Sequence, residues 1–171
     1  PVIDHFRRFF DFHPQFEEPQ IRRLLAAYYG ACSFLDEQIG RVLTQLEALG
    51  LTQSTRVIYS SDHGEHLGGR GIFGKFSLYD ESAAVPMIAA GPDVPQGAVC
   101  RTPTSLVDLY PSIIESVGAE SHNDDAGLPG RSLWTIASNP DAQRTVLSEY
   151  HAVGSQHASY MIRDERYKYN H

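Results

Sequence analysis

The longest regular feature of the sequence is an apolar repeat, spaced by three to four residues, between residues 20 and 49. This spacing gathers the apolar side chains on one face of a helix. Pro19 precedes the repeat where a first-turn proline is tolerated, and Gly50 follows its last residue. We therefore expect one long amphipathic helix over 20–49. Its apolar face comprises Ile21, Leu24, Leu25, Tyr28, Leu35, Ile39, Val42, Leu43 and Leu46.

Two short apolar runs further along the chain have the length and composition of buried strands. They are TRVIYS at 55–60 and VPMIAAG at 85–91, the second of which ends in a GPD turn signal. The helix-then-strand order suggests an α/β crossover. We expect the two strands to be neighbours, with the long helix packed on their sheet.

The remaining pattern predicts a second helix and several strands. Residues 105–119 have helical spacing, with Gly118 near the end and Pro111 either starting or kinking the helix. A loop is expected at 122–132. Residues 1–18 show no period and are expected to form an irregular lead-in. Strands are expected at 145–151, 158–164 and 166–171, with the last two forming a hairpin.

Composition narrows the class of partner. A length of 171 residues with 42% apolar side chains suits one domain with its own core. A net charge of −7 argues against nucleic acid and anionic membrane as partners. No apolar run reaches the length of a membrane span, and no targeting segment is recognisable, which leaves cytoplasm and periplasm both open. The chain starts at Pro1 and stops at His171 inside a predicted strand, so we expect both ends to be cut.

The residues with the clearest chemical character lie in VIYSSDHGEHLGGRGIFGK, at 57–75. Asp62 and His63 follow a predicted strand, where ligand sites of open α/β sheets lie. A carboxylate oxygen beside an imidazole nitrogen suits manganese, zinc or a mixed calcium site. Without further context, the same residues also fit a surface turn with a capping aspartate.

The stretch SSDHGEHLGGRGIFGKFSLYDESAAVPMIAAGP resembles the C-terminal signature of type I sulfatases, in the alkaline phosphatase superfamily. The family pattern is S-D-H/N-G-E/D, a Gly-rich loop, G-K, an acidic segment and V-P before an apolar strand. The resemblance covers residues 20–170, and the DH form with the SEYH block is most similar to choline-sulfatase-like members and phosphonate monoester hydrolases.

This resemblance implies an α/β fold: part of an alkaline-phosphatase-like mixed sheet with flanking helices, followed by an antiparallel strand segment. It divides the chain into a lead-in at 1–18, the C-terminal half of a catalytic domain at 19–120, and a truncated strand-rich segment at 121–171. Part of an enzyme is therefore expected, with half of a metal site.

The resemblance also assigns roles to individual residues. Asp62 and His63 correspond to two ligands of one divalent metal, calcium or manganese, with zinc as the alternative. Lys75 corresponds to the lysine that binds an oxygen of the sulfate near the bridging oxygen and opposes the charge on the leaving group. The glycines between them let the backbone approach a small anion.

Two interpretations are open for each of the other polar residues in the motif, and for one histidine outside it. Glu65 and His66 either support the metal ligands or lie at the rim or in a cap. Arg70 is either a solvated loop charge or a contact at the substrate rim. His151 follows a predicted strand and is either an ordinary edge histidine or a residue that faces the site.

One part of the family pattern is missing. Type I sulfatases carry Cys/Ser-x-Pro/Ala-x-Arg, whose first residue becomes the formylglycine nucleophile, and neither Cys32 nor Cys100 fits it. We therefore expect a parent that hydrolyses small sulfate esters and an isolated chain that is inactive. A phosphonate monoester or phosphodiester hydrolase and a non-catalytic binding or assembly module remain as alternatives. Homo-oligomerisation is an open expectation.

Overall fold

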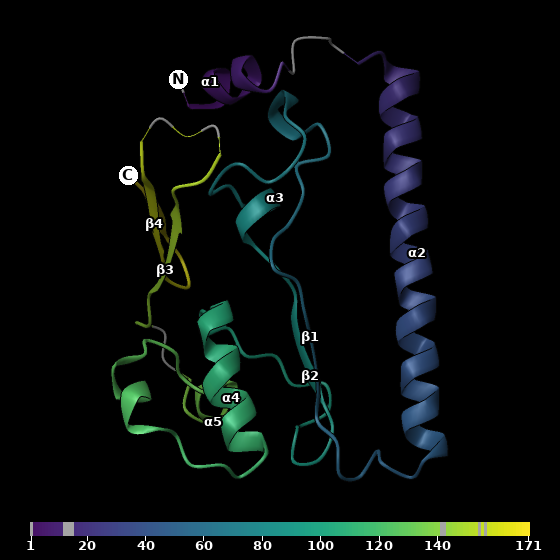
Figure 1. Ribbon diagram of the computed structural model, residues 1–171, viewed down its shortest axis with the longest axis vertical. Helices are drawn as coiled ribbons and strands as arrows, with labels where there is room; N and C mark the ends of the chain where they lie inside the picture. Colours follow the sequence, from purple (N-terminus) through teal and green to yellow (C-terminus); the bar gives the residue numbers. More distant parts are fainter. Residues whose placement is uncertain (1, 12–15, 141–142, 154, 156) are drawn as a thin grey trace. The chain divides into compact units, whose positions relative to one another are not determined.

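The protein, in this computed structural model, consists of two compact units (Figure 1). The first unit comprises residues 1–94 and 152–156, and the second comprises 95–151 and 157–171. The structure describes residues 2–11, 16–140, 143–153, 155 and 157–171. The domain boundaries predicted after residues 18 and 120 stay predictions.

Helices and a strand pair make up the first unit. In chain order its elements are α1 (Val2–Phe9), α2 (Glu18–Ala48), β1 (Val57–Ser60), a 3₁₀ turn (Gly69–Gly71), α3 (Asp80–Ala83) and β2 (Met87–Ala90).

Helix α2 is the single long helix that the apolar repeat predicts. At its start the Gln20 side chain accepts a hydrogen bond from the Glu17 backbone N–H at 2.8 Å. At its end Gly50 adopts a left-handed φ of 69° and donates to Glu47 O, while the next N–H donates to Leu46 O. These two bonds form the motif in which glycine commonly ends a helix. No described helix combines the length and apolar character that crossing a membrane requires.

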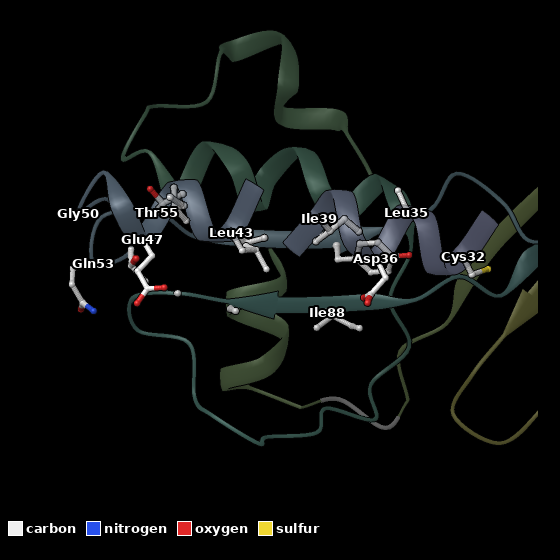
Figure 2. Close-up of a pocket in the computed structure, with 16 residues that line it drawn as sticks. Cys32, Leu35, Asp36, Ile39, Leu43, Glu47, Gly50, Gln53, Thr55 and Ile88 are labelled. Carbon is white, nitrogen blue, oxygen red and sulfur yellow. The ribbon is translucent and has the colours of Figure 1, made fainter. Parts of the chain in front are cut away.

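The apolar face of α2 differs from the prediction in its packing. No side chain of α2 is buried, although the sequence predicts that this face packs on the sheet. A groove of about 1120 Å³ lies between the helix and the strand pair. Figure 2 shows Ile39 and Leu43 of α2 and Ile88 of β2 around this groove.

Strands β1 and β2 are neighbours, as predicted, but they pair antiparallel, with Tyr59 opposite Ile88. The suggested α/β crossover concerns the helix before β1, so this pairing does not test it and it stays a prediction. The segment between the strands holds a glycine-rich loop and the single turn of α3 in place of a crossover helix, so the chain reverses direction.

The N-terminal segment is also more ordered than expected. Residues 1–18 were expected to be irregular, yet they contain α1, and residues 12–15 lie outside the described part. Phe6 of α1 is 2% exposed, and Phe10 stacks on Phe76 with ring centroids 4.1 Å apart. Aromatic burial on the glycine-rich loop stabilises this short helix, which no local period could reveal.

The second unit joins short helices to a small sheet. Its elements are a 3₁₀ turn (Leu106–Asp108), α4 (Leu109–Ser116), a second 3₁₀ turn (Asn123–Gly127), α5 (Leu133–Ser138), β3 (Val146–Tyr150), β4 (Ser159–Arg163) and β5 (Lys168–Asn170). The strands form an antiparallel sheet in the order β3-β4-β5, which confirms the predicted strands and hairpin. Pro111 lies in the first turn of α4, where its missing N–H costs no helical bond.

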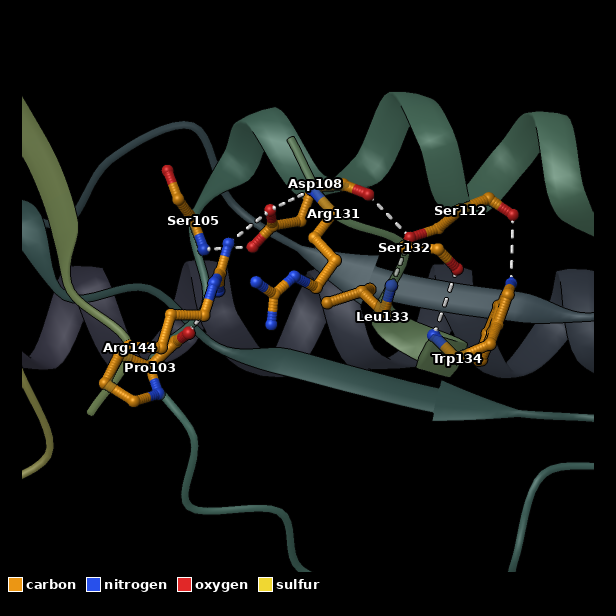
Figure 3. Close-up of polar contacts among 9 residues, drawn as sticks. All are labelled: Pro103, Ser105, Asp108, Ser112, Arg131, Ser132, Leu133, Trp134 and Arg144. Atoms are coloured by element: carbon orange, nitrogen blue, oxygen red, sulfur yellow. Dashed lines mark hydrogen bonds and ion pairs between the residues drawn. The ribbon is translucent and has the colours of Figure 1, made fainter. Parts of the chain in front are cut away.

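A buried carboxylate organises this second unit (Figure 3). Asp108 is 0% exposed and accepts hydrogen bonds from the backbone N–H groups of Ser105 and Arg131, both at 2.8 Å. Its third donor is Arg144 Nη2, at 2.7 Å from Oδ1. In the same network Trp134 Nε1 donates to Ser112 O at 2.9 Å. The bond from Ser105 is local, whereas those from Arg131 and Arg144 come from segments 23 and 36 residues away, so the carboxylate holds these segments together.

We expect Asp108→Asn to lower the free energy of unfolding by about 3–5 kcal/mol, because it leaves the buried Arg144 guanidinium without its counter-charge. Asp124→Asn is the matched control: its carboxylate is 91% exposed, and the change should stay within about 0.5 kcal/mol. Urea unfolding followed by fluorescence of Trp134, the only tryptophan, measures both. Equal stability of the two variants would contradict the organising role of Asp108.

Candidate metal and anion site

The turn after β1 brings Asp62 and His63 side by side. Asp62 Oδ1 accepts the His63 backbone N–H at 2.9 Å. Ser61 Oγ donates to His63 O at 2.8 Å, which closes the turn from the other side. The His63 N–H bond lowers the pKa of Asp62, because it stabilises the ionised carboxylate. Asp62 is therefore an anion over a wide pH range.

The imidazole of His63 is oriented with one nitrogen toward this carboxylate. Its Nδ1 lies 2.9 Å from Gly64 O, and because a carbonyl can only accept, Nδ1 carries the proton of that bond. The other nitrogen, Nε2, lies 3.4 Å from Asp62 Oδ2. In the neutral ring two lone pairs thus face each other, an arrangement that a shared cation makes favourable.

The donor set fits a divalent metal but does not complete its coordination. A cation about 2.0–2.6 Å from each donor can contact both atoms, and one carboxylate with one imidazole is a common ligand pair. Among the described residues no group of three or more His, Cys, Asp or Glu side chains is placed to hold a metal. Within the described residues, Asp62 and His63 are therefore a pair of candidate ligands and not a complete metal site.

Ser82 connects this turn to Lys75. Its carbonyl oxygen accepts the Gly64 N–H at 2.8 Å, and its hydroxyl donates to Lys75 O at 2.8 Å. Ser82 itself is 3% exposed. One buried residue at the end of α3 thus fixes the backbone at both ends of the loop, although the glycine-rich segment separates Gly64 from Lys75 in the sequence.

The side chain of Lys75 remains available for an anion. It is exposed, and in the described part of the chain its ammonium forms no ion pair. A cation on a fixed backbone with no protein counter-charge can oppose negative charge on a ligand.

The residues between the ligands and Lys75 fold back on themselves. Glu65 accepts hydrogen bonds from Leu67 N–H at 3.2 Å and from Gly74 N–H. His66 is 3% exposed, its backbone N–H donates to Gly74 O, and its Nε2 lies 2.8 Å from Ser77 Oγ. Burial lowers the pKa of the His66 ring, because the charged imidazolium would lose its hydration. Both residues therefore hold the loop itself, and neither is placed with Asp62 and His63 in a metal-ligand group.

Arg70 lies in strained backbone at the tip of the loop. Its φ of 57° is unusual for a residue with a side chain. Its guanidinium lies 3.9 Å from the ring centroid of Tyr79, and Nε is 3.6 Å from Glu81 Oε1. The Arg70 carbonyl accepts a bond from Arg7 of α1. The side chain is therefore held by an aromatic ring and a carboxylate, and a contact with substrate stays a hypothesis.

His151 belongs to the other unit, just after β3. Its Nε2 is 3.3 Å from Glu149 Oε2, and its ring meets Tyr160 edge-on at 5.4 Å. These are the contacts of an edge histidine. The alternative, in which it faces the site, stays a prediction.

Three residues that shape the site were not among those predicted. Glu81 lies in the acidic segment of the family pattern, so its negative charge could have indicated a pairing with Arg70. Ser77 and Ser82 act through hydroxyl and carbonyl oxygens on a folded loop, and no spacing in the sequence marks them.

Comparison with known proteins identifies the family. A family model described as Sulfatase matches residues 1–119. Arylsulfatase K of Mus musculus is 34% identical over 164 residues, which cover 91% of this chain and 29% of that protein. The chain belongs to the sulfatase family. Choline-sulfatase of Rhizobium meliloti (strain 1021) is similar too, with 32% identity over 152 residues that cover 89% of this chain and 30% of the relative.

Solved structures agree with this assignment. Phosphonate monoester hydrolase SpPMH from Silicibacter pomeroyi has 30% identity and a TM-score of 0.79 over 92% of this sulfatase-family chain and 35% of its own. BT1596, a 2-O GAG sulfatase, has 26% identity and a TM-score of 0.79 over 100% of this chain and 39% of its own. The predicted α/β fold of alkaline-phosphatase-like sulfatases is confirmed. The chain spans about 30% of the length of the curated relatives it matches.

We expect Gly64→Ala to destabilise the protein, since a Cβ at this position would lie 2.1 Å from the backbone oxygen of Glu81. Relieving that contact requires the Gly64–Ser82 bond to stretch, at a cost of about 1–3 kcal/mol. Gly69→Ala, whose Cβ meets no atom within 4 Å, is the control and should change stability by less than about 1 kcal/mol. Urea unfolding compares the two, and similar losses in both would show that close packing at Gly64 is unimportant.

Proposed function

We propose that this chain supplies part of the active site of a metal-dependent hydrolase of small sulfate esters. Its contribution is one pair of metal ligands, Asp62 and His63, and the leaving-group cation, Lys75. The observation that carries the proposal is the link through Ser82, which fixes the ligand turn and the lysine on one buried residue. The sulfatase family of the chain supports the choice of ester.

The charges of these residues suit the reaction. A sulfate ester transfers negative charge to its leaving oxygen as the S–O bond breaks. When bound, a divalent cation supplies Lewis-acid stabilisation of such oxygens. Asp62 and the Nε2 atom of His63 would hold that cation, with the Gly64 carbonyl keeping the imidazole in the required tautomer. The Lys75 ammonium opposes the charge on the leaving oxygen.

We propose that the nucleophile comes from outside these 171 residues, in which no serine has the required Pro or Ala two residues on and Arg four residues on. Neither cysteine lies in the Cys/Ser-x-Pro/Ala-x-Arg pattern from which the family makes formylglycine. We therefore propose that the isolated chain holds metal weakly and has no sulfatase turnover. Reading the gene upstream of Pro1 tests this: a continuous frame that includes the pattern supports it, and a stop codon without the pattern favours a binding or assembly module.

A phosphonate ester is the second candidate substrate. It is favoured by the similarity to SpPMH, with its TM-score of 0.79. Sulfate and phosphonate groups are both tetrahedral anions, so the same ligands and lysine suit either. The relative kcat/KM of the complete enzyme on matched aryl sulfate and aryl phosphonate esters separates the two.

In the complete enzyme, Asp62→Ala and His63→Ala should each remove bound metal and activity together. Either change leaves the cation with too few ligands, and the transition state should lose several kcal/mol, or about a thousandfold in kcat/KM. Metal content by mass spectrometry and turnover are measured on the same samples, with His122→Ala as a control histidine that is 75% exposed. Full metal and full turnover in either site variant would show that the ligand assignment is wrong.

Lys75→Ala should lower kcat more than it raises KM, because the ammonium meets charge that develops only in the transition state. The loss should be small for esters of acidic phenols and large for esters of ordinary alcohols, whose leaving groups need more stabilisation. Lys168→Ala removes the only other lysine, in β5, and serves as the control. An equal loss across the leaving-group series would mean that Lys75 only binds the anion.

A further inference from the structure

The carboxylate of Glu65 is used inside the loop that carries Lys75. Its Oε1 atom accepts two backbone N–H groups, one from Leu67 at 3.2 Å and one from Gly74. In the described part of the chain it forms no ion pair with a basic side chain. A charged acceptor binds amide donors more strongly than a neutral one does. The backbone N–H groups of the loop therefore bind this carboxylate as they would bind an anionic ligand.

These bonds determine the position of the peptide immediately before Lys75. The N–H of Gly74 is held by Glu65, and its carbonyl accepts the His66 N–H at 2.9 Å. Gly74 has a φ of 87°, and a Cβ there would lie 2.5 Å from the Phe76 ring. The N–H, the carbonyl and the backbone conformation of Gly74 are therefore all fixed. Among the described residues, Glu65 is the only one whose side chain bonds to the N–H or the carbonyl of Gly74.

We propose that Glu65 is a positioning residue for Lys75. It acts through the backbone of Gly74 and contacts neither metal nor substrate, so its role differs from that of Asp62 and His63. This inference rests on the proposed function of Lys75. It also explains why the loop can include several left-handed residues and still end at a defined point: its centre is closed by a part-buried set of charge-assisted bonds.

The first test uses the 171-residue chain and measures amide hydrogen exchange at Gly74. Glu65→Ala should raise the exchange rate at this amide at least about tenfold, because local opening no longer breaks a bond to the carboxylate. Glu65→Gln keeps an oxygen at the same place and should show a smaller increase. Glu37→Ala, an exposed glutamate of α2, is the control and should leave the rate unchanged. An unchanged Gly74 rate in Glu65→Ala would overturn the proposal.

The second test is a double-mutant cycle in the complete enzyme on an ester of an ordinary alcohol. Glu65→Ala should lower kcat about tenfold or more with full metal content, and Glu65→Gln should recover most of it. Because Glu65 acts through Lys75, the double variant Glu65→Ala/Lys75→Ala should be within about twofold of Lys75→Ala alone.

The outcomes separate this inference from the function on which it rests. Wild-type turnover in Lys75→Ala would overturn both the proposed function and the positioning role. A defect in Lys75→Ala with an additive loss in the double variant would overturn only the role of Glu65, as would metal loss in Glu65→Ala. If Glu65→Ala fails to fold, Glu65→Gln carries the same cycle, and additive losses there count against the proposal.

Discussion

The two hydrogen bonds of Ser82 are the constraint on which the candidate site depends. One binds the turn that contains the candidate metal ligands, and the other binds the backbone of Lys75. Without them, only the bonds within the loop would relate the ligand turn to the lysine, and ordering the two for each substrate would cost conformational entropy. A serine is small enough to be buried here and still present two oxygens to two backbones.

Polar contacts of this kind, rather than a large apolar core, give both units their shape. The buried apolar side chains of the described residues are Phe6, Ile72, Leu133, Ile136 and Met161. The buried polar set is as large, and comprises His66, Ser82, Thr102, Asp108, Ser112 and Ser132. Hydrogen bonds are directional, so such an interior specifies particular loop conformations, but it tolerates few substitutions at its polar positions.

Local patterns in the sequence predicted those elements whose formation depends on interactions between residues close in sequence. The repeat over 20–49 and the glycine after it specified α2, and the motif around Asp62 indicated the turn after β1, whose metal-binding role stays a prediction. The pattern could not give the antiparallel pairing of β1 with β2, because pairing direction depends on the path of the chain between them. Helix α1 escaped detection because its stability comes from rings distant in sequence, such as Phe76. The packing predicted for α2 also failed, since amphipathicity indicates which face can be buried but not what covers it.

The buried ring of His66 makes the candidate site sensitive to acid. In an unfolded chain this imidazole takes up a proton near its ordinary pKa of 6.5, whereas burial lowers the pKa in the folded protein. The contribution of this ring to the stability of the folded state is therefore fully present above pH 6.5 and is lost as the pH falls below that value, until the folded ring is protonated too. Acidification thus weakens the very segment that closes onto Gly74.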